Sequence, residues 1–226
     1  MSIARVLHIE SGSGFGGSAT GLVNLAPKLA LEGFEPFVAY YHKGLQIKEL
    51  ESRGVLITPI RKWHAFEDVY RLIRRHRIDL VHFNNEIYSH MSGMLAATAL
   101  KVRRVCHMRG IRPFTRGEHL AKHMIDQFIA ISDVGYDLYT KEGIPRERIR
   151  RIYNSIDLRL YKDLPSQAAL RARFGLPVEG TVIGFVSRVE PEKGHREFME
   201  AAALVLQQRP DITFAIVGGD VTPGGV

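Results

Sequence analysis

The stretch Arg5-Val-Leu-His-Ile-Glu-Ser-Gly-Ser-Gly-Phe-Gly-Gly17 decides the fold class of this 226-residue chain. Its first half is an apolar run that is typical of a buried strand. Its second half is a glycine-rich turn with the spacing G-x-G-x-x-G at Gly12, Gly14 and Gly17. A buried strand that passes through glycines into a helix is typical of α/β folds, and glycines there let backbone amides approach an anionic ligand closely.

Strands and helices alternate along the rest of the first 160 residues or so. Strand-like runs cover residues 5–10, 36–41, 55–60, 80–85, 103–109, 128–132 and 149–154. Helix patterns include residues 18–32, with Leu22, Leu25, Ala26 and Leu29 on one face, and residues 65–77, with Phe66, Val69, Tyr70 and Ile73 on one face. This alternation with near-continuous apolar strands predicts an α/β fold whose parallel sheet is covered on both faces.

A second unit of the same kind begins after a break near residues 158–180. Ser166 is a candidate N-cap for a helix that runs to Phe174 and ends at Gly175-Leu-Pro177. A buried strand (181–187), a helix (194–209) and another strand (213–217) then form one βαβ unit. We therefore expect a Rossmann-like domain over residues 1–162 and the start of a second over residues 163–226.

Two cations, Arg188 and Lys193, follow the first strand of that second unit. Placed there, they could neutralise a diphosphate that gains charge as its bond to a sugar breaks, although two solvated loop cations explain the pattern equally well. The glycine turn by itself is a weak signal, and a tight turn without a ligand also explains it. A dinucleotide fold would place an acid after the second strand, where this chain has Tyr40-Tyr41-His42, so nicotinamide or flavin binding is disfavoured.

Composition narrows the class of protein further. The single cysteine, Cys106, excludes an internal disulfide and a zinc site of thiolates, and we expect it to pack in the core. No secretory signal or membrane-spanning run is evident, which suits the cytoplasm. The net charge of +7 suits phosphate-bearing ligands, an anionic membrane or nucleic acid, and equally a solvated basic surface. The sequence holds no Asp-x-Asp pair, G-x-S-x-G elbow or P-loop.

Several stretches together resemble the retaining glycosyltransferases of the GT-B fold, in the large family 4 of nucleotide-sugar-dependent enzymes. These are Gly16-Gly17, Phe128-Ile-Ala-Ile-Ser132, Ile152-Tyr-Asn-Ser-Ile-Asp157, Gly184-Phe-Val-Ser-Arg-Val-Glu-Pro-Glu-Lys-Gly194 and Phe214-Ala-Ile-Val-Gly-Gly219. The resemblance implies two Rossmann-like domains around an active-site cleft, with the acceptor on the first and the nucleotide sugar on the second. It also implies that no cofactor and no metal is needed.

The resemblance assigns roles to particular residues. Arg188 and Lys193 would grip the donor diphosphate, Gly16, Gly17 and Gly218 would lie near phosphates, and His107 would place the donor sugar. Arg109 would contact acceptor or phosphate, and Asn154 and Asp157 match a segment near the domain junction, although Ser155 replaces the family's glycine there. Asn84 and Glu86 are candidate acceptor contacts from their place at a strand end, which loop polarity explains equally well. A histidine at a strand end is also often satisfied by backbone groups alone.

The expected function is retaining transfer of a sugar from a nucleoside diphosphate to a hydroxyl of a glycan, lipid-linked or small-molecule acceptor, as in polysaccharide biosynthesis. The family's pair of glutamates, expected beyond Gly219, has no counterpart here, so we expect these residues by themselves to transfer sugar poorly or not at all. A non-catalytic half of a split enzyme and a GT-B sugar-nucleotide epimerase are the alternatives. The basic residues Arg71, Arg74, Arg75 and Arg77 suit peripheral contact with an anionic membrane, or a solvated helix face. Nucleic-acid binding is not expected.

Overall fold

The computed structural model describes residues 4–11, 17–43 and 45–219. The chain divides into two compact units, Met1–Ile156 and Asp157–Val226. The boundary expected from the sequence, between residues 162 and 163, lies inside the smaller unit. Each unit is described by itself below.

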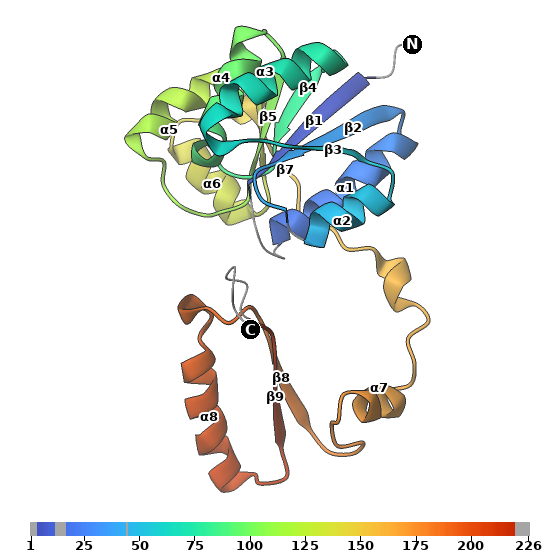
Figure 1. The fold of residues 1–226 in the computed structure, drawn as a ribbon. Coiled ribbons are helices and arrows are strands. Elements are labelled where there is room, and N and C mark those ends of the chain that lie inside the picture. The colour runs from blue at the N-terminus through green and yellow to red at the C-terminus, as the bar shows by residue number, and fades with distance from the viewer. Residues whose placement is uncertain (1–3, 12–16, 44, 220–226) are drawn as a thin grey trace. The chain divides into compact units, whose positions relative to one another are not determined.

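The described strands of the larger unit form one parallel sheet of seven strands in the order β3-β2-β1-β4-β5-β6-β7 (Figure 1). They are β1 (Ala4–Glu10), β2 (Phe34–Tyr40), β3 (Leu56–Pro59), β4 (Leu80–Phe83), β5 (Arg103–Met108), β6 (Gln127–Ala130) and β7 (Ile149–Arg151). The predicted α/β class and parallel sheet are confirmed. The strand order reverses between β1 and β4, and such a reversal leaves a crevice at the carboxyl ends of the two strands.

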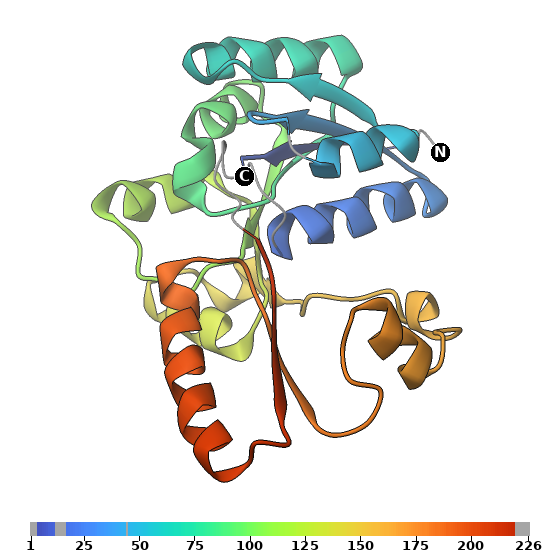
Figure 2. The ribbon, with the colours of Figure 1, turned by 60° about the horizontal axis from the view of Figure 1, so that its bottom comes forward.

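Helices cover both faces of this sheet, and Figure 2 shows the strands between α1 and α3. The α-helices are α1 (Gly17–Leu31), α2 (Leu45–Ser52), α3 (Ala65–His76), α4 (Met91–Ala99), α5 (Arg116–Ala121) and α6 (Asp133–Lys141). Short 3-10 helices are η1 (Lys62–His64), η2 (Ile87–His90), η3 (Lys122–Met124) and η4 (Arg146–Arg148). The helix predicted over residues 18–32 corresponds to α1, and the one over 65–77 to α3.

Alternate residues of β2 enter two separate cores. In β2, Phe37 and Ala39 join the core under α3 and α4, whereas Val38 and Tyr40 join the core under α1 and α2. This is the period-2 alternation of a strand with both faces covered, so the strand reads as continuously apolar. The thiol of Cys106 is buried in the first core, as expected.

Several details differ from the sequence prediction: the strand predicted over residues 149–154 ends at Arg151, and the strand predicted as buried over 181–187 is largely exposed. Phe66 was expected to pack under α3 but is 42% exposed and stacks on Tyr70, because Ala65, Val69 and Ile73 form the buried face instead. The strand predicted over residues 80–85 ends at Phe83, since the side chains that follow it make polar contacts at the edge of the sheet.

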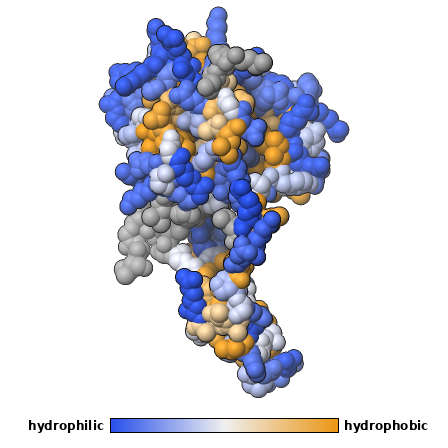
Figure 3. Space-filling view, turned by 90° about the vertical axis from the view of Figure 1, so that its right-hand side faces the viewer, coloured by the Kyte–Doolittle hydropathy of each residue, from blue (hydrophilic) through white to orange (hydrophobic). Residues whose placement is uncertain are grey.

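The smaller unit is one βαβ unit preceded by two short helices. It contains η5 (Leu158–Tyr161), α7 (Gln167–Arg173), β8 (Val182–Val186), η6 (Pro191–Lys193), α8 (His195–Gln208) and β9 (Thr213–Val217), and β8 pairs with β9 in parallel. The predicted N-cap is present, because the Ser166 hydroxyl accepts a hydrogen bond from the Ala169 amide at 3.3 Å. Apolar side chains remain at the surface of this unit, as the orange atoms in Figure 3 show, and Val186 and Val217 are 78% and 57% exposed.

Candidate active site

A buried polar cluster occupies the carboxyl ends of β1 and β4, where the strand order reverses. Glu10 ends β1 and Asn84 follows β4, and both are 0% exposed. The Asn84 amide donates to one Glu10 carboxylate oxygen and to the Ser18 carbonyl at 3.0 Å. Asn85 Nδ2 donates to the other Glu10 oxygen at 3.1 Å. These donors compensate the burial of the carboxylate and hold the first turn of α1 against the sheet.

Arg109, two residues beyond His107 at the end of β5, is anchored on this cluster. Its Nε donates to the Asn84 carbonyl at 2.9 Å, and one Nη donates to Asn84 Oδ1 at 2.8 Å. The other Nη donates to Asn154 Oδ1 at 3.1 Å, which ties β5 to the segment after β7. Burial lowers the pKa of Arg109, and the negative charges of Glu10 and Glu86 oppose that shift.

Glycine at position 21 allows the guanidinium to lie against α1. A Cβ at Gly21 would be 2.9 Å from one Arg109 Nη and 3.2 Å from its Cζ. Any larger residue would therefore collide with the guanidinium, and this explains why a glycine stands within the helix at a cost in helix propensity.

His107 presents a proton donor next to Arg109. An Arg109 Nη lies 3.4 Å from His107 Nδ1, and a guanidinium can only donate, so Nδ1 accepts and the proton is on Nε2. His107 is 9% exposed, and Nε2 has no hydrogen-bond partner among the described residues. Burial, followed by the charge of Arg109, lowers the pKa of His107 to about 3, so the ring is neutral at physiological pH.

Two more buried histidines continue from His107 across the sheet. His8 on β1 and His82 on β4 are register partners, and their Nδ1 atoms are 2.8 Å apart. The His82 ring lies 5.6 Å from the His107 ring, centroid to centroid. Burial lowers the pKa of His8 to about 4 and the pKa of His82 well below its usual value. The three histidines are therefore neutral, and between His8 and His82 one ring donates the hydrogen bond and the other accepts it.

Arg109, His107 and Asn154 line a pocket of about 360 Å³ that lies wholly within the larger unit. Its other walls come from the first three turns of α1, from Ile129 and from the segment after β7 (Gly17, Thr20, Gly21, Leu25, Ile129, Ile152, Tyr153, Ser155 and Ile156). The N-terminus of a 15-residue helix and a guanidinium thus meet one pocket, and both favour an anion. Gly17 is the first residue of α1, whereas Gly16 lies outside the described residues.

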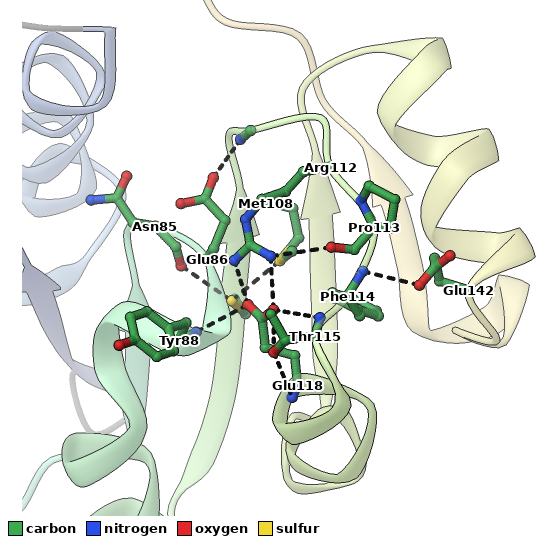
Figure 4. A network of polar contacts seen from close by, with 12 residues as sticks. Asn85, Glu86, Tyr88, Met108, Arg112, Pro113, Phe114, Thr115, Glu118 and Glu142 are labelled. Atoms are coloured by element: carbon green, nitrogen blue, oxygen red, sulfur yellow. Dashed lines mark hydrogen bonds and ion pairs between the residues drawn. The ribbon is translucent and has the colours of Figure 1, made fainter.

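The loop after Arg109 is fixed by two carboxylates (Figure 4). Glu86 accepts from the Gly110 amide. Glu118 is 1% exposed and accepts from the Arg112 guanidinium at 2.6 and 2.8 Å, from Thr115 and from the Tyr88 amide at 3.3 Å. Burial tends to raise the pKa of Glu118, but the donors from Arg112 and Thr115 hold it at about 2. The segment that carries Arg109 is therefore bonded to the segment after β4.

In the smaller unit, Arg188 and Lys193 lie in the loop between β8 and α8, as expected. Arg188 forms an ion pair with Glu190 at 2.6 Å, and Lys193 is exposed in η6. Gly218 is required by packing, because a Cβ there would lie 1.8 Å from the Ser187 carbonyl oxygen. Its structural role is the close approach of the β8 and β9 ends.

The structure brings most of the sequence-predicted residues of the larger unit together. His107, Arg109, Asn84 and Asn154 form one bonded group, and Glu86 supports the next residue of the loop. Asp157 belongs to the smaller unit, where it caps η5 and binds the Arg159 guanidinium at 2.6 and 2.9 Å.

Glu10, Gly21 and the His8–His82 pair were not predicted as site residues. The sequence could have indicated Glu10, because an acid at the carboxyl end of a buried parallel strand lies where such folds bind ligands. Gly21 is one glycine inside a helical pattern, and its meaning depends on an arginine 88 positions away, at Arg109, which no local pattern reveals.

No group of three or more His, Cys, Asp or Glu side chains in the described ranges is arranged to hold a metal ion. Among the described helices, none is both long and apolar enough to cross a membrane.

The fold and this pocket define the class of protein, and comparison with known families agrees. Residues 15–160 match the model of glycosyltransferase family 4, and residues 166–223 match that of glycosyl transferases group 1. The chain belongs to glycosyltransferase family 4.

Individual relatives are distant. The 2-deoxystreptamine glucosyltransferase of Streptomyces kanamyceticus is 26% identical over 68% of this chain and 45% of its own length. The D-inositol 3-phosphate glycosyltransferase of Thermobispora bispora is 34% identical over 33% of this chain and 18% of its own length. The chain thus spans less than half the length of these curated relatives.

Among solved structures, Anabaena Alr3699/HepE in complex with UDP and glucose superposes with a TM-score of 0.80. It is 22% identical, and the match covers 96% of this chain and 61% of that chain. Staphylococcus aureus MnaA with UDP gives a TM-score of 0.68 at 14% identity, covering 96% of this chain and 63% of that one. Both likenesses show the shared fold.

Proposed function

We propose that this protein takes part in the transfer of a sugar from a nucleoside diphosphate to a hydroxyl acceptor, with retention of the anomeric configuration. The observation that supports the proposal best is the Arg109–His107 pair at the N-terminus of α1, in a chain of a glycosyltransferase family. That pocket offers positive potential from Arg109 and the N-terminus of α1, which favours the phosphate of a phosphorylated sugar.

The leaving diphosphate gains negative charge as its bond to the sugar breaks, so groups that bind it more tightly in the transition state accelerate the reaction. In the larger unit, Arg109 and the first turn of α1 supply such groups. In the smaller unit, we assign the same role to Arg188 and Lys193. Arg188 already binds Glu190 at 2.6 Å, so it would share its guanidinium between that carboxylate and a phosphate. No metal or other cofactor is part of this proposal.

His107 is assigned to the donor sugar. Its Nε2–H is buried and lacks a partner within the described residues, and a sugar hydroxyl that reached it would accept from it. Because the pKa of His107 lies at about 3, the ring takes up no second proton at neutral pH and acts as a neutral hydrogen-bond donor. Asn154 would orient Arg109 from the far side of the pocket.

Asn84 and Glu86 take a different role from the acceptor contacts that the sequence suggested. Both use their side chains on internal partners, Asn84 on Glu10 and Arg109, and Glu86 on the Gly110 amide. We propose that they position Arg109 and the loop behind it, so the acceptor is bound elsewhere on the same edge of the sheet.

Peripheral contact with a membrane at the cytoplasmic face is a separate part of the proposal. Arg71, Arg74 and Arg75 are exposed on α3, and among the described residues only Arg71 of these three forms an ion pair, with Glu67 at 3.4 Å. Cofloatation with vesicles tests this: binding that requires phosphatidylglycerol supports the contact, and equal binding to neutral vesicles removes it.

A sugar-nucleotide epimerase is the second candidate, because solved structures of UDP-N-acetylglucosamine 2-epimerases share the fold. Proton NMR of UDP-N-acetylglucosamine incubated with the protein separates the two. Inversion at C2 without an acceptor would establish epimerisation, and an unchanged sugar nucleotide favours transfer. A non-catalytic half of a split enzyme would bind a second polypeptide in co-purification.

Calorimetric titration with UDP and UDP-glucose tests the donor assignment. We expect both to bind, and His107→Ala to weaken UDP-glucose about tenfold while leaving UDP unchanged, because His107 meets the sugar and not the nucleotide. The control is His123→Ala, an exposed histidine outside the pocket. If neither ligand binds, or His107→Ala weakens both equally, the assignment is wrong.

A further inference from the structure

A second pocket, of about 530 Å³, lies on the same edge of the larger unit and shares no residue with the first. It is built from loops at the carboxyl ends of successive strands. Its lining residues are Ser11, Tyr41, His42, Lys62, Trp63, Ala65, Tyr88, Ser89, Met91 and Ser92. Its volume falls within the range of about 300–1,000 Å³ that is common for small-molecule sites.

Two large aromatic side chains border this pocket with little packing of their own. Trp63, in η1, is 91% exposed, and Tyr88, in η2, is 73% exposed. The ring of Tyr88 points away from Glu118, while its backbone amide is held by that carboxylate (Figure 4). Exposed rings on a fixed backbone offer flat apolar surfaces to a ligand that also has polar edges, which is the character of a pyranose ring.

The charged side chain that lines this pocket is Lys62, and no acid is among the lining residues. No carboxylate in the described ranges lies within ion-pair distance of Lys62. An uncompensated ammonium beside aromatic rings favours a ligand that carries a negative group.

Hydrogen bonds connect this pocket to the first one. Ser11 Oγ, in the second pocket, accepts from Asn85 Nδ2 at 3.1 Å, and the same amide donates to Glu10. Glu10 accepts from Asn84, which in turn binds Arg109 in the first pocket. The two pockets are therefore neighbours along one edge, joined by the buried cluster at the strand reversal.

We infer that the second pocket binds a sugar ring bearing a carboxylate or phosphate, with the ring against Trp63 and Tyr88 and the anionic group at Lys62. The inference that this acidic sugar is the acceptor rests on the proposed function. The binding itself does not, because it depends on residues that the first pocket does not use.

Trp63 is the sole tryptophan of the chain, so its fluorescence reports directly on this pocket. The probes are methyl glucuronide, glucose 6-phosphate and the neutral methyl glucoside. We expect methyl glucuronide or glucose 6-phosphate to shift the Trp63 emission to shorter wavelength and to protect Trp63 from quenching by acrylamide. Both effects should saturate, at a concentration about tenfold lower than for methyl glucoside, because one charge-assisted hydrogen bond supplies that factor. Saturation-transfer NMR with the same sugars checks the contact independently of the indole.

Lys62→Gln should abolish the preference for the anionic sugars, and Tyr88→Ala should weaken all three. Lys141→Gln is the matched control, an exposed lysine on α6 outside the pocket. No response to any probe in either measurement, or equal responses to charged and neutral sugars, would overturn the inference. An emission shift caused by phosphatidylglycerol vesicles but not by the sugars would also overturn it, because it would assign Trp63 to a membrane surface. UDP-glucose titration of the same samples shows separately whether the donor assignment holds.

Discussion

Replacing Gly21 by alanine tests the arrangement of Arg109 against α1. The new Cβ would lie 2.9 and 3.0 Å from the two Arg109 Nη atoms, so the guanidinium has to withdraw by roughly 0.5 Å to reach ordinary contact. That movement strains the hydrogen bonds of 2.8 and 2.9 Å to Asn84. One hydrogen bond to a charged group contributes about 1.5–3 kcal/mol, and 1.4 kcal/mol is a factor of ten, so we expect UDP-glucose to bind about 10- to 100-fold more weakly.

The global stability should change by less than the binding free energy. Alanine favours a helix over glycine by up to about 1 kcal/mol, which offsets part of the strain. Calorimetric titration with UDP-glucose and thermal unfolding of the same sample measure the two effects. Gly117→Ala is the control, since this glycine lies in α5 with nothing within 4 Å of a new Cβ. Wild-type affinity in Gly21→Ala would refute the proposed dependence of donor binding on the position of Arg109.

Three further substitutions probe other parts of the account. Gly218→Ala should destabilise the smaller unit by about 3 kcal/mol or more in chemical denaturation, because a backbone carbonyl occupies the Cβ position, while Gly219→Ala, with open space, should not. Burial lowers the pKa of His90 to about 3, so the stability that its neutral form contributes is complete above the unfolded pKa of about 6.5 and is lost as the pH falls towards 3. His90→Leu should therefore reduce the loss of unfolding free energy between pH 7.5 and pH 5 by about 2 kcal/mol. An unchanged dependence of the unfolding free energy on pH would contradict this. Glu118→Gln weakens the ion pair between the buried Glu118 and the partly exposed Arg112 and should cost about 1.5 kcal/mol in urea unfolding, as for a hydrogen bond to a charged group; no measurable cost would show that the pair does not hold the loop.

The sequence predicted the elements better than the contacts between them. Periodicity identified the strands and α1, α3 and α8, because each presents an apolar run or stripe that the fold buries. α4 was not identified by name, since Met91-Ser-Gly-Met-Leu-Ala-Ala-Thr-Ala99 is small and apolar around much of its circumference and shows no clear stripe. The strand ends were placed too far along the chain where Asn84 and Asn85 follow β4, because their polar role appears only once Glu10 lies beside them.

For the site, too, the sequence predicted the residues better than the contacts between them. His107, Arg109 and Asn154 were predicted from motif positions, and the fold brings them to one pocket. The anchoring of Arg109 on Asn84 and against Gly21 joins residues from three separate segments, so no local pattern contains it. Asp157 appeared next to Asn154 in the sequence, yet it binds Arg159 in the other unit.

Nitrogen-15 NMR of the His107 imidazole reports both the protonation of the ring and its contact with the donor sugar. We expect a neutral ring with its proton on Nε2 at pH 7, and a shift of that resonance with UDP-glucose that UDP by itself does not cause. A proton on Nδ1, or a ring that does not respond to the sugar nucleotide, would contradict the assignment of this pocket to the donor sugar.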